Sequence, residues 1–319
     1  MNDSPAVLIL GGSGFVGRAL CEQLVRHFGG AARITVPTRR LPSAQAIQSL
    51  PGLTVLQADV HDDGQLRGLL QGQDLVFNLI AILHGSEAAF ERVHVALPRR
   101  LAAACRELGP RRLIHVSALG AAADAPSRYL RSKARGEAAL LQAGLDLTLL
   151  RPSVIFGAED RFLNLFARLQ AHFPLLPLAG AAARFQPVWV EDVAAALLRC
   201  IEDPGTVGQT YELAGPRSAS LAELVRLAGR CAGHPRPILP LPAPLAWLQA
   251  GLLELLPGEP LMSRDNLASM RVPNVAGGRL PGLAELGITP HAVEAIAPGY
   301  LAAGQGPARL DAWRAGAGR

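Results

Sequence analysis

Cysteine, aromatic residues and lysine are all scarce in this chain of 319 residues. Its four cysteines include no CxxC pair, so the sequence predicts free thiols in a reducing compartment, without a disulfide framework or a bound metal. Charged residues make up 18% of the chain and apolar residues 50%, a balance that excludes intrinsic disorder and supplies a large core. The formal net charge of +5 comes from arginines scattered in pairs rather than gathered in a run, so nucleic-acid binding is not expected.

Long apolar runs are missing as well. The nearest, residues 245–256, is interrupted by Gln249 and Glu254 and is shorter than a membrane span of about 18 residues. It belongs to a proline-bounded segment, residues 240–256, that is either the core of a smaller lobe or a patch for a membrane surface or a partner protein. At the other end, the first apolar segment begins by Ala6 and passes directly into a glycine loop, so no removable leader is expected.

Short apolar runs alternate with helix-like patterns through the first half of the chain. The apolar runs, interpreted as buried strands, are residues 6–10, 33–36, 53–56, 75–80, 113–116 and 147–150. The helix-like stretches between them include residues 16–27, 63–70, 90–108 and 128–143. Because buried strands that alternate with helices form parallel sheets covered on both faces, the pattern predicts an α/β fold with a doubly wound parallel sheet, a Rossmann domain.

The rhythm changes after Arg151, and proline and glycine become more frequent from Gly215 onward. We therefore expect a nucleotide-binding domain over residues 1–155, with its sheet completed by about residues 186–214. Residues 156–185 and 215–319 are expected to form a smaller lobe for a substrate or a partner.

A glycine-rich loop follows the first predicted strand and opens the first predicted helix. Its residues are Gly11, Gly12, Ser13, Gly14, Phe15, Val16 and Gly17. Small residues at such a turn let backbone N–H groups approach a pyrophosphate, and the helix N-terminus adds partial positive charge. In this strand–loop–helix context the loop predicts a dinucleotide site.

The strand ends that follow favour NADP(H) over NAD(H). An NAD site requires an acid about 20 residues beyond the loop, but no Asp or Glu lies between Glu22 and Asp59. The second strand instead ends at Arg39 and Arg40, which suit a 2′-phosphate. Other expected cofactor contacts are Asp59 and Val60 after the third strand and Leu79 and Ala81 after the fourth.

Among 31 basic residues only Lys133 is a lysine, and it lies four residues after Tyr129, one of three tyrosines. Residues at this spacing share a helix face. An ammonium beside a phenol favours the phenolate and lowers its pKa, and lysine is a compact donor for a nicotinamide ribose. The pair therefore predicts a general acid–base, Tyr129, with Lys133 as its pKa tuner and ribose ligand.

Taken together, these motifs and their order resemble the short-chain dehydrogenase/reductase superfamily, in its extended or atypical branch, over about residues 5–300. Three segments, residues 127–137, 151–164 and 263–267, resemble one subgroup in particular: the NADPH-binding accessory subunit of respiratory complex I and its bacterial relatives. The resemblance adds Pro152, Ser153 and Val154 to the expected cofactor contacts. The missing leader and the arginine-rich composition favour a bacterial member.

The resemblance also implies a catalytic Ser or Thr just after the fifth strand, to hold a substrate carbonyl oxygen. Ala118 falls in that position, and Ser117, one residue earlier, is the candidate that remains. Many relatives have a structural Asn where His94 lies, and we expect His94 to bridge backbone groups. His115 is expected to be a satisfied core residue, whereas Asp160 and Arg161 either contact a substrate or pair with each other.

Two functions therefore stay open. One is an NADP(H)-dependent oxidoreductase or epimerase-like enzyme for a hydrophobic carbonyl or a quinone-like substrate. The other is a non-catalytic accessory, assembly or redox-sensing protein that holds NADPH near complex I or ubiquinone metabolism. For both functions we expect a cytoplasmic location. Peripheral contact with the inner membrane or with a respiratory-chain protein is compatible with that location.

Overall fold

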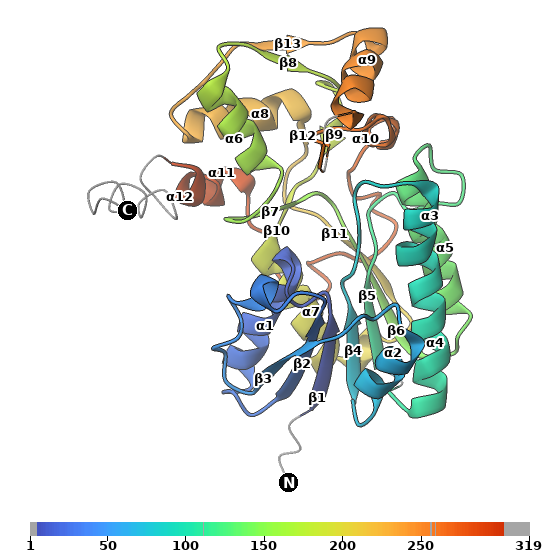
Figure 1. Cartoon of the computed structure of the whole chain (residues 1–319). Helices are drawn as coiled ribbons and strands as arrows, with labels where there is room; N and C mark the ends of the chain where they lie inside the picture. The colour runs from blue at the N-terminus through green and yellow to red at the C-terminus, as the bar shows by residue number, and fades with distance from the viewer. Residues whose placement is uncertain (1–4, 111, 256, 259, 303–319) are drawn as a thin grey trace. The chain divides into compact units, whose positions relative to one another are not determined.

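The computed structural model describes residues 5–110, 112–255, 257–258 and 260–302 (Figure 1). Contacts within the chain define two units. Unit 1 comprises Met1–Pro152, Val190–Leu213 and Gly277–Thr289. Unit 2 comprises Ser153–Trp189, Ala214–Ala276 and Pro290–Arg319.

Unit 1 is built on a seven-stranded sheet in which every pairing is parallel. The strands are β1 (Ala6–Leu10), β2 (Arg33–Thr38), β3 (Leu53–Gln57), β4 (Leu75–Asn78), β5 (Arg112–Val116), β6 (Asp146–Pro152) and β11 (Thr210–Leu213). Their order, β11-β6-β5-β4-β1-β2-β3, reverses direction between β1 and β4. This order confirms the predicted doubly wound fold, and it places the crevice typical of ligand binding at the carboxyl ends of β1 and β4.

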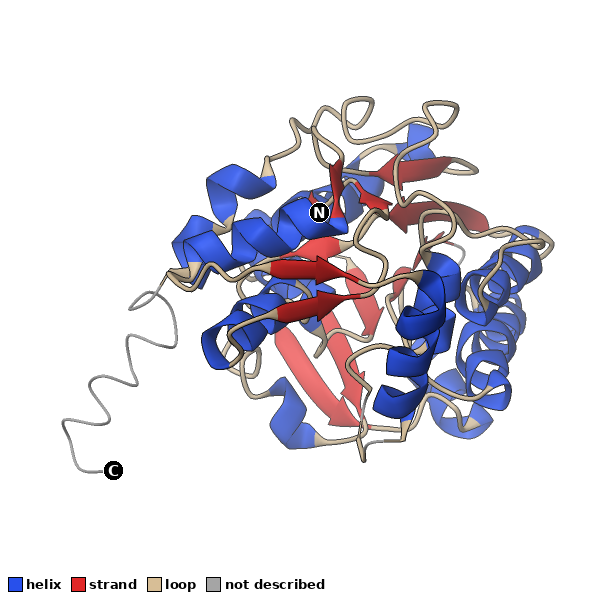
Figure 2. Cartoon of the chain, turned by 90° about the horizontal axis from the view of Figure 1, so that it is seen from above, coloured by secondary structure: helices blue, strands red, loops and turns tan. Residues whose placement is uncertain are grey.

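Helices flank the strands of this sheet (Figures 1 and 2). On one side lie α1 (Phe15–His27) and α7 (Val190–Glu202), which contact each other. On the other side lie α2 (Asp63–Leu70), α4 (Leu97–Leu108) and α5 (Arg128–Leu141). Alternate strand residues such as Leu8, Val76 and Leu113 pack with Leu66 of α2 and Leu101 of α4 in one buried cluster. The near-continuous apolar strands of the sequence follow from this burial on both faces.

Helix ends in unit 1 follow local rules. Asp62 caps α2 by accepting from the Gln65 amide at 2.8 Å, and Ser127 caps α5 by accepting from the Leu130 amide at 3.2 Å. The remaining elements of this unit are short: η1 (Leu41–Ala44), α3 (Glu87–Phe90), the π-helical segment η2 (Glu91–Ala96) and η3 (Pro204–Thr206). The predicted helix over residues 90–108 thus corresponds to the last residue of α3, all of η2 and all of α4.

Two stretches fall differently from the predicted division of the chain. Residues 277–289 lie in unit 1 rather than in the smaller lobe, because the Glu212 amide of β11 donates to the Pro281 carbonyl at 2.9 Å. The predicted strand near residues 186–190 does not join the large sheet. Only Val188–Trp189 of this stretch forms a strand, β10, and it pairs with β7 (Ile155–Phe156) in unit 2.

Unit 2 combines short strand pairs with helices. Besides β7 and β10, it contains β8 (Leu176–Leu178) with β13 (Ile238–Pro240) and β9 (Arg184–Phe185) with β12 (Ala219–Ser220). Its helices are α6 (Leu163–His172), α8 (Leu221–Cys231), α9 (Ala243–Glu254), α10 (Arg264–Ser269), α11 (Val293–Ile296) and α12 (Pro298–Leu301). Its core joins α6 to α8, where Gln170 Nε2 donates to the Val225 carbonyl at 2.8 Å.

Helix α9 is not the core of this unit. It buries only Ala246 and Ala250, while Trp247, Leu248 and Leu252 remain exposed. Over residues 240–255 the structure therefore favours the alternative interpretation, an apolar surface patch, and Leu256 lies outside the described residues. Across the described residues, no helix has both the length and the apolar character needed to span a bilayer.

Candidate functional site

Three glycines of the loop, Gly11, Gly12 and Gly17, occupy positions where a side chain would not fit. Gly11 has φ +87°, and a Cβ on Gly17 would lie 2.4 Å from the Gly11 carbonyl oxygen. A Cβ on Gly12 would lie 2.8 Å from both methyl groups of Val36. The loop is closed by the Gly14 amide, which donates to the Gly11 carbonyl at 3.0 Å. At Gly17 backbone therefore packs directly on backbone, and helix α1 begins at Phe15, directly after Gly14.

The first turn of α1 carries no acidic residue, and Gly14 at its N-cap provides no side-chain cap. The amide groups at this helix end are among those that an intrahelical bond does not satisfy. Ser13, Phe15 and Val16 are half-buried beside them. The positive end of the helix dipole and these amides together form a cradle for a phosphate group.

Two arginines follow β2, as the sequence predicts. Arg39 and Arg40 are both exposed. The turn that carries them is held by Thr38 Oγ1 and Ser43 Oγ, which donate to the Arg40 carbonyl at 3.1 and 2.6 Å. The turn therefore fixes the backbone of Arg40 while both guanidinium groups project toward solvent.

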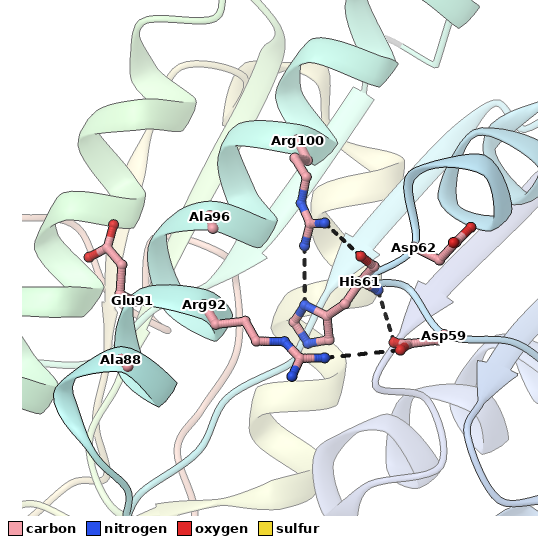
Figure 3. Close-up of a pocket in the computed structure, with 8 residues that line it drawn as sticks. All are labelled: Asp59, His61, Asp62, Ala88, Glu91, Arg92, Ala96 and Arg100. Carbon is pink, nitrogen blue, oxygen red and sulfur yellow. Dashed lines mark hydrogen bonds and ion pairs between the residues drawn. The ribbon is translucent and has the colours of Figure 1, made fainter.

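A pocket of about 710 Å³ opens beside the end of β3 (Figure 3). Its lining comprises Asp59, His61, Asp62, Ala88, Glu91, Arg92, Ala96 and Arg100. Arg100 donates to the His61 carbonyl at 2.6 Å and to His61 Nδ1 at 3.2 Å, so that Nδ1 is an acceptor. Arg92 lies 4.0 Å from Asp59, and burial together with the Arg92 charge lowers the pKa of His61. Sequence reasoning identified Asp59 and the buried Val60 next to it, but it missed both of these arginines, which come from η2 and α4.

The Tyr129–Lys133 pair lies on α5 at helical spacing. Lys133 is 1% exposed, and its Nζ donates to the Val116 carbonyl at the end of β5, at 2.8 Å. Burial lowers the pKa of Lys133 to about 8, and burial raises the pKa of Tyr129 to about 12. The expected lowering of the tyrosine pKa is therefore not present in the protein alone, because burial disfavours the phenolate.

Three buried polar atoms at the ends of β4 and β5 have no hydrogen-bond partner among the described residues. They are Asn78 Nδ2, His115 Nδ1 and Ser117 Oγ. Asn78 and His115 are register partners across the two strands, and Ser117 lies two residues beyond His115. Buried polar groups are normally paired, so these three mark a place for a polar ligand or water. We expected His115 to be a core residue with all of its hydrogen bonds made, and this is wrong for its Nδ1 atom.

The remaining predicted residues are divided between the units. In unit 1, Leu79 is half-buried and Ala81 is exposed after β4, Pro152 ends β6, and the buried Ala118 lies two residues beyond the end of β5. Ser153 and Val154 belong to unit 2, where the Ser153 hydroxyl and the Val154 amide both donate to Asn274 Oδ1, at 2.6 and 2.9 Å.

Asp160 also belongs to unit 2. It accepts hydrogen bonds from the Gly157 amide at 3.0 Å and from the Phe162 amide at 2.8 Å. The hydroxyl of Tyr300 donates to the same carboxylate at 2.9 Å. Asp160 therefore organises a turn before α6. Within the described residues no cluster of potential metal ligands occurs.

Comparisons with known proteins show the family of the chain. The model of the NAD dependent epimerase/dehydratase family matches residues 7–214, and the chain belongs to that family. A mitochondrial protein of Mus musculus, NADH dehydrogenase (ubiquinone) 1 alpha subcomplex subunit 9, is 34% identical over 296 residues, which cover 90% of this chain and 77% of the mouse protein. Its Arabidopsis thaliana counterpart is 29% identical over 309 residues, 92% of this chain and 76% of that protein.

A similar fold is found in an NADPH-dependent quinone oxidoreductase from Escherichia coli, solved with NADPH. It superposes with a TM-score of 0.73 at 21% identity, over 91% of this chain and 98% of that one. The glycine cradle and the unpaired polar atoms at the β4 and β5 ends both fit the dinucleotide that the family is named for.

Proposed function

We propose that unit 1 binds NADP(H). The glycine loop would receive the pyrophosphate, since its backbone is closed to side chains and opens into the N-terminus of α1. Arg39 and Arg40 would bind the 2′-phosphate, because both are exposed at the end of β2 and no acid is available there for an NAD ribose. Asp59 would accept from the adenine amino group, and Val60, Leu79 and Ala81 would line the nucleotide.

We propose further that this site reduces a hydrophobic carbonyl or a quinone-like substrate. The observation that carries this proposal is the buried Lys133 ammonium on the same helix face as Tyr129. When bound, NADPH supplies a hydride. Tyr129 would donate its phenolic proton to the substrate oxygen, and Lys133 would hold the nicotinamide ribose while its charge favours the phenolate that results. Ser117 Oγ, buried and without a partner among the described residues, would orient the substrate oxygen.

Ala118 favours a second function. The catalytic hydroxyl that the family resemblance implies after the fifth strand is absent at this position, and the mouse and Arabidopsis relatives are by name subunits of an NADH dehydrogenase. In this alternative, Tyr129 and Lys133 hold NADP(H) as a fixed ligand of an accessory, assembly or redox-sensing protein. The exposed apolar residues of α9 would then contact a respiratory partner or the surface of the inner membrane.

Native mass spectrometry of the purified chain separates the two. NADPH that co-purifies at one per chain and fails to exchange with excess NADP⁺ would support the accessory function. An empty or rapidly exchanging site would support the enzyme, and a screen of carbonyls and quinones, with Tyr129→Phe as the control, would then identify the substrate class. A chain that binds neither nucleotide would refute both.

The preference for the 2′-phosphate is tested by Arg39→Ala and Arg40→Ala. Hydrogen bonds to charged groups contribute about 1.5–3 kcal/mol each, so each variant is expected to weaken NADPH binding by roughly 10- to 150-fold. NADH binding should not change, and isothermal titration calorimetry measures both affinities. Equal losses for NADPH and NADH would contradict the assignment.

A further inference from the structure

The helix that follows β4 contains an irregular turn. Residues Glu91–Ala96 form the π-helical segment η2 between α3 and α4. Such segments are rare and are frequently found at functional sites. Within η2, His94 and Val95 are buried, and His94 is 2% exposed. The wide turn therefore places a histidine in the interior, toward α5.

The two ring nitrogens of His94 join two different segments. Nε2 accepts from the Ile82 amide at 3.1 Å, and Nδ1 lies 2.8 Å from Ser132 Oγ. Because an amide N–H only donates, Nε2 must be unprotonated, and the ring proton is on Nδ1 and is donated to Ser132. The Ser132 hydroxyl in turn donates to the Tyr129 carbonyl at 2.7 Å.

Packing holds this ring in one orientation. Phe90 stacks on it at 5.5 Å, and the Tyr129 ring meets its edge at 5.5 Å. Gly136 of α5 packs against the backbone of η2. A Cβ at this position would lie 2.0 Å from the His94 carbonyl oxygen, so only glycine allows the two helices to approach this closely. Burial and the nearby Lys133 charge lower the pKa of His94 to about 3, so the ring is neutral over the physiological range.

We infer that His94 is a positioning residue for the nicotinamide end of the site, because its neutral Nδ1–H ring links the Leu79–Ile82 segment to the helix that carries Tyr129 and Lys133. This inference rests on the proposed function, in which both of these regions face the bound dinucleotide. The link lies within unit 1, and it consists of the hydrogen bonds from Ile82 through His94 and Ser132 to Tyr129.

Binding measurements with two ligands test the inference. His94→Phe keeps an aromatic ring between Phe90 and Tyr129 but removes both hydrogen bonds. It is expected to weaken NADPH binding about three- to tenfold, the equivalent of one neutral hydrogen bond, and to leave binding of adenosine 2′,5′-bisphosphate unchanged. Ser132→Ala breaks the link from the other side and should reproduce this split. His94→Gln, which retains one acceptor and one donor, should restore most of the NADPH affinity.

The opposite results would overturn the inference. Equal weakening for both ligands would show that His94 only stabilises the fold, and unchanged binding in His94→Phe and Ser132→Ala would show that the link does not act on the site. Failure of the wild-type chain to bind NADPH would refute the proposed function instead. Independently of any ligand, ¹⁵N NMR of the histidine ring should show Nδ1–H and an unprotonated Nε2, and an Nε2–H tautomer or an imidazolium at neutral pH would refute the link itself.

Discussion

Replacement of the single lysine should change how the stability of the protein depends on pH. Lys133 is buried, and its pKa is lowered from 10.5 to about 8 because burial disfavours the ammonium. Below the folded-state pKa the side chain is charged in both the folded and the unfolded chain, so the full cost of burying the charge is present. As the pH rises from about 8 to 10.5, the unfolded chain keeps a proton that the folded chain has lost, and the free energy of unfolding increases.

The size of this effect follows from the shift. Each pKa unit corresponds to about 1.36 kcal/mol, so the lowered pKa of Lys133 amounts to a penalty of about 3 kcal/mol at neutral pH. In Lys133→Met the penalty is absent at every pH. The difference in free energy of unfolding between wild type and Lys133→Met should therefore shift in favour of the wild type by about 2–3 kcal/mol between roughly pH 7 and pH 10.

Urea unfolding of the nucleotide-free protein, followed by circular dichroism at several pH values, measures this difference directly. Arg131→Met is the matched control, because Arg131 lies on the same helix and its side chain likewise donates to backbone carbonyls, those of Ala125 and Pro126. Arginine, unlike lysine, is not deprotonated in proteins. Its difference from wild type should be constant with pH. A difference for Lys133→Met that is equally constant would refute the argument that a buried charge controls this region.

Three further predictions concern the same unit. The pKa of His94 is lowered from 6.5 to about 3, so the protein should lose stability as the pH falls between these values, and His94→Gln should reduce that slope by up to about 1.4 kcal/mol per pH unit in acid titrations. Gly17→Ala should lower the free energy of unfolding by about 1–3 kcal/mol and abolish NADPH binding, because only backbone surrounds the new methyl group. Gly68→Ala, where the new methyl group meets open space on α2, should instead raise the free energy of unfolding by about 0.5–1 kcal/mol. Similar behaviour of the two variants in thermal melts and NADPH titrations would contradict this. Glu137→Gln removes the charge of the buried partner in a bidentate pair with the partly exposed Arg151 and should cost about 1.5–3 kcal/mol in urea unfolding, and a loss below about 0.5 kcal/mol would argue against the pair.

Much of unit 1 could be predicted from the sequence because the signals are local. Buried parallel strands require apolar runs, tight strand-to-helix turns require glycine, and residues four apart share a helix face. These rules were sufficient for the doubly wound parallel sheet, for the glycine loop that starts at Gly11, and for the shared helix face of Tyr129 and Lys133. The spacing of the two side chains was correct, but the direction of the tyrosine pKa was not, because the spacing contains no information about desolvation.

What the sequence by itself determined is therefore the class of fold, the glycine loop and the residue types available to a dinucleotide. Only the tertiary structure decided which distant residues meet. The π-helical turn that brings His94 to Ser132, the approach of Arg92 to Asp59, and the return of residues 277–289 to β11 all depend on segments far apart in the chain. Side-chain packing and hydrogen bonding across such distances leave no periodic pattern in the sequence, because each contact depends on the shape of the surface it meets.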